Sequence, residues 1–360
     1  MQESLLELIC CPACQQSLTV QSQTVKEPEI WEGTLHCPHC HATYPIHNGL
    51  PLLYVNNEKW QPKAIEAAGW VTYHKDLGIY DIGENPTDLK IPYYPKEPWI
   101  QVAQSFDIAL QELNLTGDEL ILDLGAGRGW AAKHFALLGC RVVALDVVPD
   151  MNIGLGRSRA LMDDAGVYFD RIIGDGENLP FFPGHFDLIF CSAALHHSSH
   201  LDILLQNASQ ALKSGGRLIA INEPCRSIFE DEQEILDHSA SHELEVGINE
   251  TRPDLAEYEE AFTQAGLAII KAFPITTYNM DIEDLRSWVT FLRNTRPSFR
   301  QRPSRQQLLG WVRYTLFRFH SQVKPFFINK NTTQNERANL EKAILNWVSS
   351  AIIILAKKET

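Results

Sequence analysis

A chain of 360 residues with 44% hydrophobic and 21% charged residues has an ordinary globular composition, sufficient for one large domain with appendages or for two domains. No apolar run reaches the roughly 18 residues of a membrane span, and MQESLLELICCPAC lacks the features of a secretory signal, so we expect a cytoplasmic protein without membrane contact. The net charge of −14 argues against a polyanion binder as a whole, although residues 281–360 hold 14 of the 31 Lys and Arg residues.

Two cysteine pairs near the start of the chain have the spacing of a metal site. Cys11 and Cys14 lie in one CPxC sequence, and Cys37 and Cys40 lie in a second one, after 22 intervening residues. Each pair places two thiolates on one tight turn, and two such turns complete a tetrahedral sulfur shell that suits zinc or iron. A unit this small gains stability from a metal. We therefore expect a structural metal in residues 1–55, with no open position for catalysis.

Residues 56–118 are rich in aromatic side chains and prolines. Tyr93, Tyr94 and Trp99 lie in IPYYPKEPW, which is a candidate wall of a ligand pocket. Packing against a core, or a linker role, explains the same aromatic residues. We interpret this range as a linker and a helical cap.

Residues 119–275 alternate between strand and helix patterns, which indicates a parallel α/β sheet. Five apolar runs, from ELILDLG to RLIAINEP, are predicted strands, and FDLIFCSAALHH is apolar as in a strand covered on both faces. Before the fifth run, LDILLQNASQALKSGG has helical spacing and a Gly-Gly stop. Ligands of open parallel sheets bind beyond the carboxyl ends of the strands. The five predicted strands end at polar residues, namely Asp123, Asp146, Asp175, His196 and Glu223.

The turn after the first of these strands, ILDLGAGRGW, decides between two classes of nucleotide-like ligand. It holds Gly125, Gly127 and Gly129, whereas a dinucleotide fingerprint needs its third glycine where Trp130 stands. Asp123, two residues before the first glycine, would repel a diphosphate. A carboxylate at this place suits a ligand that carries an amino group.

S-adenosylmethionine has an α-ammonium group and no phosphate, so it is the ligand that this turn favours. Its ribose hydroxyls need an acceptor, which Asp146 can supply at the end of the second strand. Its adenine amino group needs another acceptor, which Asp175 can supply in GDGENLPF.

Together these motifs resemble the class I S-adenosylmethionine-dependent methyltransferases, in particular those of type 11. LDLGAGRG, ALD, GDGENLPF, FDLIFCSAALHH and LKSGGRLIAINEP follow in that family's order and spacing. The resemblance implies an enzyme with a Rossmann-like α/β fold and a seven-stranded sheet whose last strand is antiparallel and inserted between its neighbours. It also implies the cofactor-binding residues, which are Asp123, Gly125, Ala126, Gly127, Gly129, Asp146, Asp175, Gly176, Glu177 and Ser192.

The last two strands of such a sheet have candidates near the end of the chain. GLAIIKAF, residues 266–273, fits the sixth strand, and AIIILAKKE, residues 351–359, fits the seventh. Residues 276–346 then form a basic helical insertion before the final strand in residues 347–360. Its arginines, mixed with Trp and Phe, suit contact with RNA or an acidic protein, and a solvated helical surface explains them as well.

Residues 5–54, which end in YPIHNGLPLLY, resemble the small zinc-ribbon proteins that activate tRNA, rRNA and release-factor methyltransferases. The resemblance implies a β-rich structural or partner-contact module with bound zinc and no chemistry of its own. We expect Cys14→Ala to unfold this ribbon and to leave the cofactor affinity of the core largely unchanged.

Candidate bases for the methyl acceptor follow the fourth and fifth strands. His196 and His197 suit an O–H or N–H acceptor near neutral pH, and Glu223 is the third candidate; one histidine packing beneath the cofactor is the alternative. The Asn/Asp-Pro-Pro-Tyr sequence of amino-methylating DNA and protein enzymes is absent after the fourth strand. We therefore expect methylation of a small metabolite or biosynthetic intermediate at oxygen or nitrogen. RNA base methylation is the first alternative, and a non-catalytic binding protein is the second.

Overall fold

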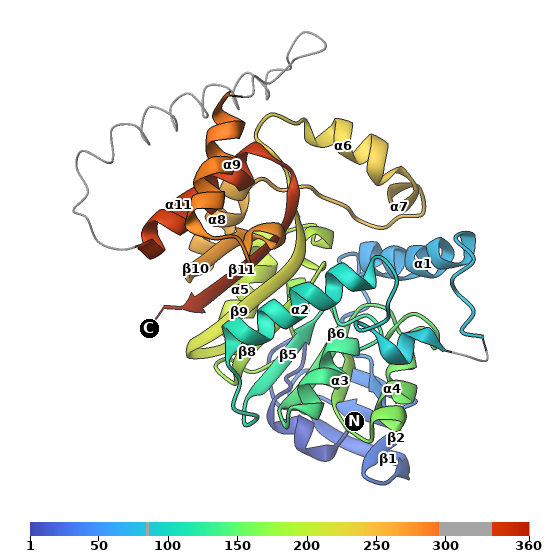
Figure 1. Cartoon of the computed structure of the whole chain (residues 1–360). Helices are drawn as coiled ribbons and strands as arrows, with labels where there is room; N and C mark the ends of the chain where they lie inside the picture. The colour runs from blue at the N-terminus through green and yellow to red at the C-terminus, as the bar shows by residue number, and fades with distance from the viewer. Residues whose placement is uncertain (84–85, 295–332, 360) are drawn as a thin grey trace.

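The computed structural model describes residues 1–83, 86–294 and 333–359 and shows an α/β protein with two sheets (Figure 1). The larger sheet has seven strands in the order β10-β11-β9-β8-β5-β6-β7. Its parallel strands are β5 (Leu120–Leu124), β6 (Arg141–Asp146), β7 (Asp170–Ile173), β8 (Phe186–Ser192) and β9 (Leu212–Cys225). The other two are β10 (Leu267–Pro274) and β11 (Ser350–Lys358), and β11 pairs antiparallel with both β9 and β10. The predicted fold class, with its inserted antiparallel last strand, is confirmed.

Both faces of this sheet are covered, which explains the apolar runs in its strands. On one face, Ile121 and Phe190 pack in a cluster with residues of α2 (Trp99–Leu113), α3 (Trp130–Leu137) and α4 (Ser158–Ala165). On the other face, Leu122 and Ile189 pack with α5 (Leu201–Ala211) and α8 (Leu255–Gln264). Alternate residues of one strand therefore serve two separate cores.

The helix before β9 ends earlier than its Gly-Gly stop predicts. α5 ends at Ala211, and Leu212 already has an extended backbone and pairs with Phe186 of β8. Gly215 and Gly216 consequently lie within β9. The predicted helix end was wrong because strand pairing with β8, which local sequence does not reveal, begins at Leu212.

The N-terminal segment forms the smaller, four-stranded antiparallel sheet in the order β1-β2-β3-β4. It follows a short 3-10 helix, η1 (Glu3–Glu7), and its strands are β1 (Thr19–Lys26), β2 (Glu29–His36), β3 (Thr43–His47) and β4 (Leu50–Pro51). Its side chains share one buried cluster with the large sheet, in which Leu35 and Ile46 join Val143 and Ile172. The small sheet is thus packed onto the core and shares its interior.

Two helical parts border the large sheet. α1 (Gln61–Asp76) contacts α7 (Ser241–Glu245), which follows α6 (Glu232–Ser239), at one end of the sheet (Figure 1). Short 3-10 turns join the elements, namely η2 (Thr87–Lys90), η3 (Leu155–Arg157), η4 (Gly176–Asn178), η5 (Leu195–His197) and η6 (Ile275–Thr277).

The described parts of the predicted insertion form a second helical region. α9 (Ile282–Asn294) and α11 (Thr333–Trp347) pack through a small apolar cluster, and α11 contacts β10. Arg286 of α9 pairs with Glu336 of α11 and with Glu283, which neutralises it. LLGWVRYTLFRFH and most of the other arginines lie outside the described residues. Within the described ranges, none of the helices combines the length and apolar character that crossing a membrane requires.

Candidate cofactor and active site

A cavity of about 370 Å³ lies at the carboxyl ends of β5, β6, β7 and β8 and is bordered by α1. Its volume is in the range of small-molecule and cofactor sites. The predicted site residues that line it are Gly125, Ala126, Gly127, Asp146, Asp175, Gly176, Glu177, Ser192 and His197. The structure therefore brings the glycine turn and the ends of four strands together around one space.

The glycine turn needs its left-handed backbone and its lack of side chains. Gly125 has φ +74°, and a Cβ on it would lie 2.5 Å from Cβ of Ala194. Gly129 has φ +80°, and a Cβ there would lie 3.0 Å from the ring of Phe169, so this glycine packs beneath the turn instead of lining the cavity. A side chain at either place would push the turn out of position.

Asp123 lies under the turn and not on the cavity wall. Its carboxylate is 2% exposed and accepts the backbone N–H of Ala132 in the first turn of α3 at 3.0 Å. Burial raises the pKa of Asp123 to about 7, and Asp146 adds to the effect. This carboxylate acts on the cavity through the helix and the turn that it holds.

Asp146, the last residue of β6, lines the cavity and is held by the glycine turn. Its Oδ2 atom accepts the N–H of Gly127 at 2.8 Å, and its Oδ1 atom accepts the N–H of Val148 at 2.8 Å. Burial raises the pKa of Asp146. Each oxygen still has a lone pair, so the carboxylate is oriented and can accept hydrogen bonds from a ligand.

Asp175 and Glu177 follow β7 and have different surroundings. Asp175 accepts the N–H of Glu177 at 2.9 Å, and burial raises its pKa. The Glu177 carboxylate lies 3.0 Å from Nζ of Lys63 and accepts hydrogen bonds from Ser198 and Ser199. Burial alone would raise the pKa of Glu177, but Lys63 and these hydrogen bonds lower it. Glu177 thus ties α1 to the core, whereas Asp175 keeps acceptor capacity for a ligand.

The two candidate histidines have separate positions. His196 is buried away from the cavity wall, and its Nδ1 atom lies 2.8 Å from Oε2 of Glu223. Glu223 is fully buried and also accepts the backbone N–H groups of Ala194, Leu195 and His196. Glu223 therefore fixes the turn after β8 and the ring of His196, and it does not face the cavity.

Of the two candidate histidines, His197 lines the cavity. Its Nδ1 atom donates to the carbonyl oxygen of Asn249 at 2.7 Å, which leaves the lone pair on Nε2. Burial lowers the pKa of His197 to about 3, so the ring is neutral near pH 7. Glu250 lies 3.5 Å from its Nδ1 atom and 3.9 Å from Nε2 of His196, and is paired with Arg252.

Several cavity residues were missed by the sequence prediction, and most of them lie on one helix. α1 presents Lys63, Glu66, Trp70 and His74 to the cavity, and Arg128 of the glycine turn also lines it. Of the candidate wall residues, Trp99 lines this cavity, whereas Tyr93 and Tyr94 are not among its lining residues. The spacing of the α1 residues is that of one helix face. Their mixed polar character hides this face, since a search for apolar periodicity reads it as a solvated surface. The signal that was available in the sequence is the interpretation of residues 56–118 as a linker and a helical cap.

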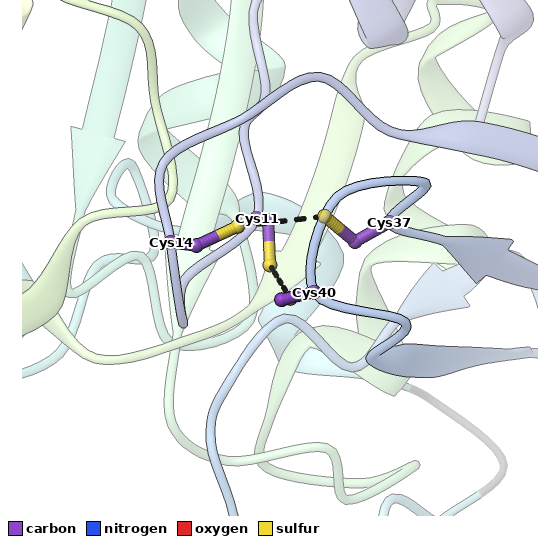
Figure 2. A group of neighbouring side chains, drawn as sticks. All are labelled: Cys11, Cys14, Cys37 and Cys40. Atoms are coloured by element: carbon purple, nitrogen blue, oxygen red, sulfur yellow. Dashed lines mark hydrogen bonds between the residues drawn. The ribbon is translucent and has the colours of Figure 1, made fainter.

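The four predicted metal ligands converge in the small sheet. Figure 2 shows Cys11 and Cys14 from one turn pointing toward Cys37 and Cys40 from the other. Sγ of Cys11 lies 3.6 Å from Sγ of Cys40, and Sγ of Cys14 lies 3.5 Å from Sγ of Cys37. Tetrahedral zinc with Zn–S bonds of about 2.3 Å needs sulfurs about 3.8 Å apart. The thiols therefore fit zinc with a small adjustment.

Comparison with known proteins assigns both parts of the chain. Residues 122–220 match the family described as "Methyltransferase domain", and residues 2–49 match the family described as "Trm112p-like protein". The sarcosine/dimethylglycine N-methyltransferase of Halorhodospira halochloris is 33% identical over 169 residues, which are 45% of this chain and 60% of that protein. The biotin biosynthesis bifunctional protein BioHC of Cellvibrio japonicus is 34% identical over 115 residues, 32% of this chain and 21% of that protein.

Neither of these matches spans two thirds of the relative's length. Among solved structures, that of the [4+2]-cyclase SpnF is 16% identical, covers 82% of this chain and 96% of its own, and has a TM-score of 0.50. At this identity the likeness shows the fold alone. The chain therefore joins a Trm112p-like zinc-ribbon domain to a methyltransferase domain of the class I fold.

Proposed function

We propose that the protein is an S-adenosylmethionine-dependent methyltransferase that acts on a small metabolite or biosynthetic intermediate at oxygen or nitrogen, with structural zinc in the ribbon. The observation that carries the proposal is one cavity that contains both the glycine turn and two oriented carboxylates, Asp146 and Asp175. Because SpnF has the same fold and is named a cyclase, the fold does not by itself imply methyl transfer. The side chains of the cavity carry the argument.

These side chains fit the cofactor. Both oxygens of Asp146 are held by backbone N–H groups and retain lone pairs, which suits the neighbouring hydroxyls of a ribose. Asp175 provides an acceptor for an adenine amino group. Four carboxylates line the cavity, those of Glu66, Asp146, Asp175 and Glu177, and they outnumber its two cationic side chains, Lys63 and Arg128, so a sulfonium nucleoside is favoured over a diphosphate. When bound, S-adenosylmethionine supplies a methyl group activated by its sulfonium.

His197 is the residue that we assign to the acceptor. Its Nε2 lone pair is available for the O–H or N–H group that loses its proton, and the contact with Asn249 fixes the ring. The neutral ring accepts a hydrogen bond from this group and so orients the acceptor toward the methyl group, and the proton leaves to solvent once the new bond has formed. His196 and Glu223 are positioning residues, because they hold the turn that carries His197.

A small acceptor is favoured over RNA. The cavity is bordered by α1, with Trp70 and Trp99 on its wall, and this leaves room for a compact group. A relative named for methylation of sarcosine and dimethylglycine supports nitrogen as the acceptor atom. Contact of the basic insertion with RNA or an acidic protein stays a prediction, because most of its arginines lie outside the described residues. Arg286, which is described, pairs with two glutamates and does not support such a contact. The cytoplasmic location also stays a prediction.

Transfer of labelled methyl groups from S-adenosylmethionine into fractionated cell extract tests the proposal. We expect label in a small-molecule fraction, insensitive to ribonuclease and lost with Asp146→Ala. Label that disappears with ribonuclease would support the RNA alternative. Cofactor binding without transfer to any fraction would support the non-catalytic alternative.

A further inference from the structure

The cap helix α1 turns charged side chains inward and an apolar side chain outward. Lys63 and Glu66 are 8% and 6% exposed, whereas Ile65 is 56% exposed. Both buried groups line the cavity that contains the glycine turn. Burial of a carboxylate costs free energy unless hydrogen bonds compensate for the lost water. These two buried charged side chains therefore need hydrogen-bond or ion-pair partners inside the cavity.

Glu66 lacks a close donor among the described residues. Its only polar contact there is Nζ of Lys63 at 3.7 Å, beyond the usual hydrogen-bond range. Lys63 lies closer to Glu177, at 3.0 Å. Burial raises the pKa of Glu66 to about 7, Lys63 opposes this rise, and the charges of Asp146 and Asp175 add to it. The Glu66 carboxylate is thus buried, faces the cavity and has unused acceptor capacity.

The neighbours of Glu66 indicate which part of a ligand reaches it. Asp146 and Asp175 are the cavity carboxylates whose charges act on Glu66, and they end the adjacent strands β6 and β7. Lys63, one turn before Glu66, anchors this end of α1 to Glu177 just after Asp175. Glu66 therefore lines the same cavity as the two carboxylates assigned to ribose and adenine, and it lies close enough for their charges to act on it.

We propose that Glu66 accepts a hydrogen bond from a ribose hydroxyl, so that the cap and the core hold the sugar between Glu66 and Asp146. This inference rests on the proposed adenosine cofactor. A ribose offers two hydroxyl donors with one proton each, and each oxygen of Asp146 already accepts one backbone N–H, so in this arrangement Asp146 accepts from one hydroxyl and Glu66 accepts from the other.

The arrangement links the cofactor to the acceptor side of the cavity. Trp70 follows Glu66 by one helical turn on the same face, and its ring centroid lies 5.2 Å from that of His197 in an edge-on contact. A sugar bound to Glu66 holds α1 against the core. It thereby fixes the position of Trp70 beside the histidine that we assign to the acceptor.

Calorimetry with S-adenosylhomocysteine and its 2′-deoxy and 3′-deoxy analogues tests this inference on the metal-loaded full chain. Glu66→Ala should weaken S-adenosylhomocysteine binding about 10-fold, the effect of one hydrogen bond to a charged group. The control Thr72→Ala, an exposed residue of α1, should bind as the native chain does. The native chain should bind one of the two deoxy analogues about 10-fold more weakly than S-adenosylhomocysteine. Glu66→Ala should weaken the binding of that analogue little further, because the hydroxyl that Glu66 contacts is already missing.

Glu66→Gln, which keeps the side-chain size, provides the same comparison if Glu66→Ala does not fold, with a smaller loss. The inference is overturned if the Glu66 variants bind S-adenosylhomocysteine as Thr72→Ala does, or if the losses from the variant and from both deoxy analogues simply add. A native chain that binds no S-adenosylhomocysteine would overturn the proposed function itself, which is a different result.

Discussion

The backbone N–H of Leu53 donates a hydrogen bond to the carbonyl oxygen of Ile173 at 2.8 Å. The end of the zinc ribbon therefore continues the edge of the large sheet at β7. On the other side of the ribbon, Cys10 donates its N–H to the carbonyl oxygen of Pro180 at 2.9 Å. Asp175 lies between Ile173 and Pro180 in the sequence. The ribbon therefore holds the chain on both sides of a residue that borders the cavity.

This packing argues against the sequence-based expectation that the ribbon can unfold without affecting the core. We predict that Cys14→Ala, or removal of the metal by a chelator, lowers the midpoint of thermal unfolding by about 5–10 °C and weakens S-adenosylhomocysteine binding severalfold. Scanning calorimetry and titration calorimetry measure the two effects. Gln16→Ala, an exposed change next to the first cysteine turn, is the control. Unchanged ligand affinity in the metal-free protein would restore the original expectation.

His197 is predicted to act on the acceptor and not on the cofactor. His197→Gln replaces the neutral ring and removes its Nε2 lone pair, so the turnover number should fall about 100-fold, a loss that misplacement of an acceptor can cause. The affinity for S-adenosylhomocysteine should stay within about 2-fold of the native value. Steady-state kinetics and calorimetry separate the two quantities. Native turnover by His197→Gln would remove this residue from the mechanism.

Glu223 is predicted to act through structure. Glu223→Gln replaces a buried carboxylate that accepts three backbone N–H groups and the ring of His196. The free energy of unfolding should fall by about 2–3 kcal/mol, because the amide cannot accept all of these hydrogen bonds and leaves buried donors without an acceptor. Denaturant unfolding measures this loss. An unchanged stability with a large loss of turnover would instead mark Glu223 as a catalytic group.

The pKa of Glu66, about 7 in the folded protein against 4.5 ordinarily, predicts a pH-dependent stability. Because the folded state holds this proton more tightly than the unfolded state, the free energy of unfolding falls as pH rises from about 4.5 to 7. Glu66→Gln removes that loss, so the ligand-free variant should be more stable than the native protein at pH 8, by about 2–3 kcal/mol. The advantage should vanish below pH 4.5.

The charged groups that act on Glu66, namely Lys63, Asp146 and Asp175, are present in both proteins, as is Glu177, which pairs with Lys63. The difference between the unfolding curves of the two proteins therefore reports the replacement of Glu66. Denaturant unfolding at pH 5, 6, 7 and 8 gives this difference. A constant difference across the series would contradict a raised pKa at this residue.

The fold was predictable because its information is local and periodic. The apolar strands follow from burial on both faces, which neighbouring residues such as Ile121 and Leu122 divide between two cores. The end of α5 at Ala211 was not predictable in this way, because it depends on pairing of Leu212 with Phe186, 26 residues earlier. The antiparallel last strand came from the family resemblance.

The site was predictable only where strand ends determine it. Asp146 and Asp175 reach the cavity because parallel strands end at one edge of the sheet. The contribution of α1 was missed, since Glu66 and Lys63 look like solvent-exposed residues until η4 is placed against them. The choice between His196 and His197 also needed the structure, because adjacent residues of one turn point into different surroundings.

Titration of the metal-loaded protein with S-adenosylmethionine, compared with Asp146→Ala, tests the central claim most directly. We predict one site per chain in the native protein and an affinity about 5- to 150-fold lower in Asp146→Ala, corresponding to about 1–3 kcal/mol for unpaired ribose hydroxyls. Asp202→Ala, at an exposed position of α5, should bind normally. Absence of binding to the native protein, or native affinity in Asp146→Ala, would contradict the account.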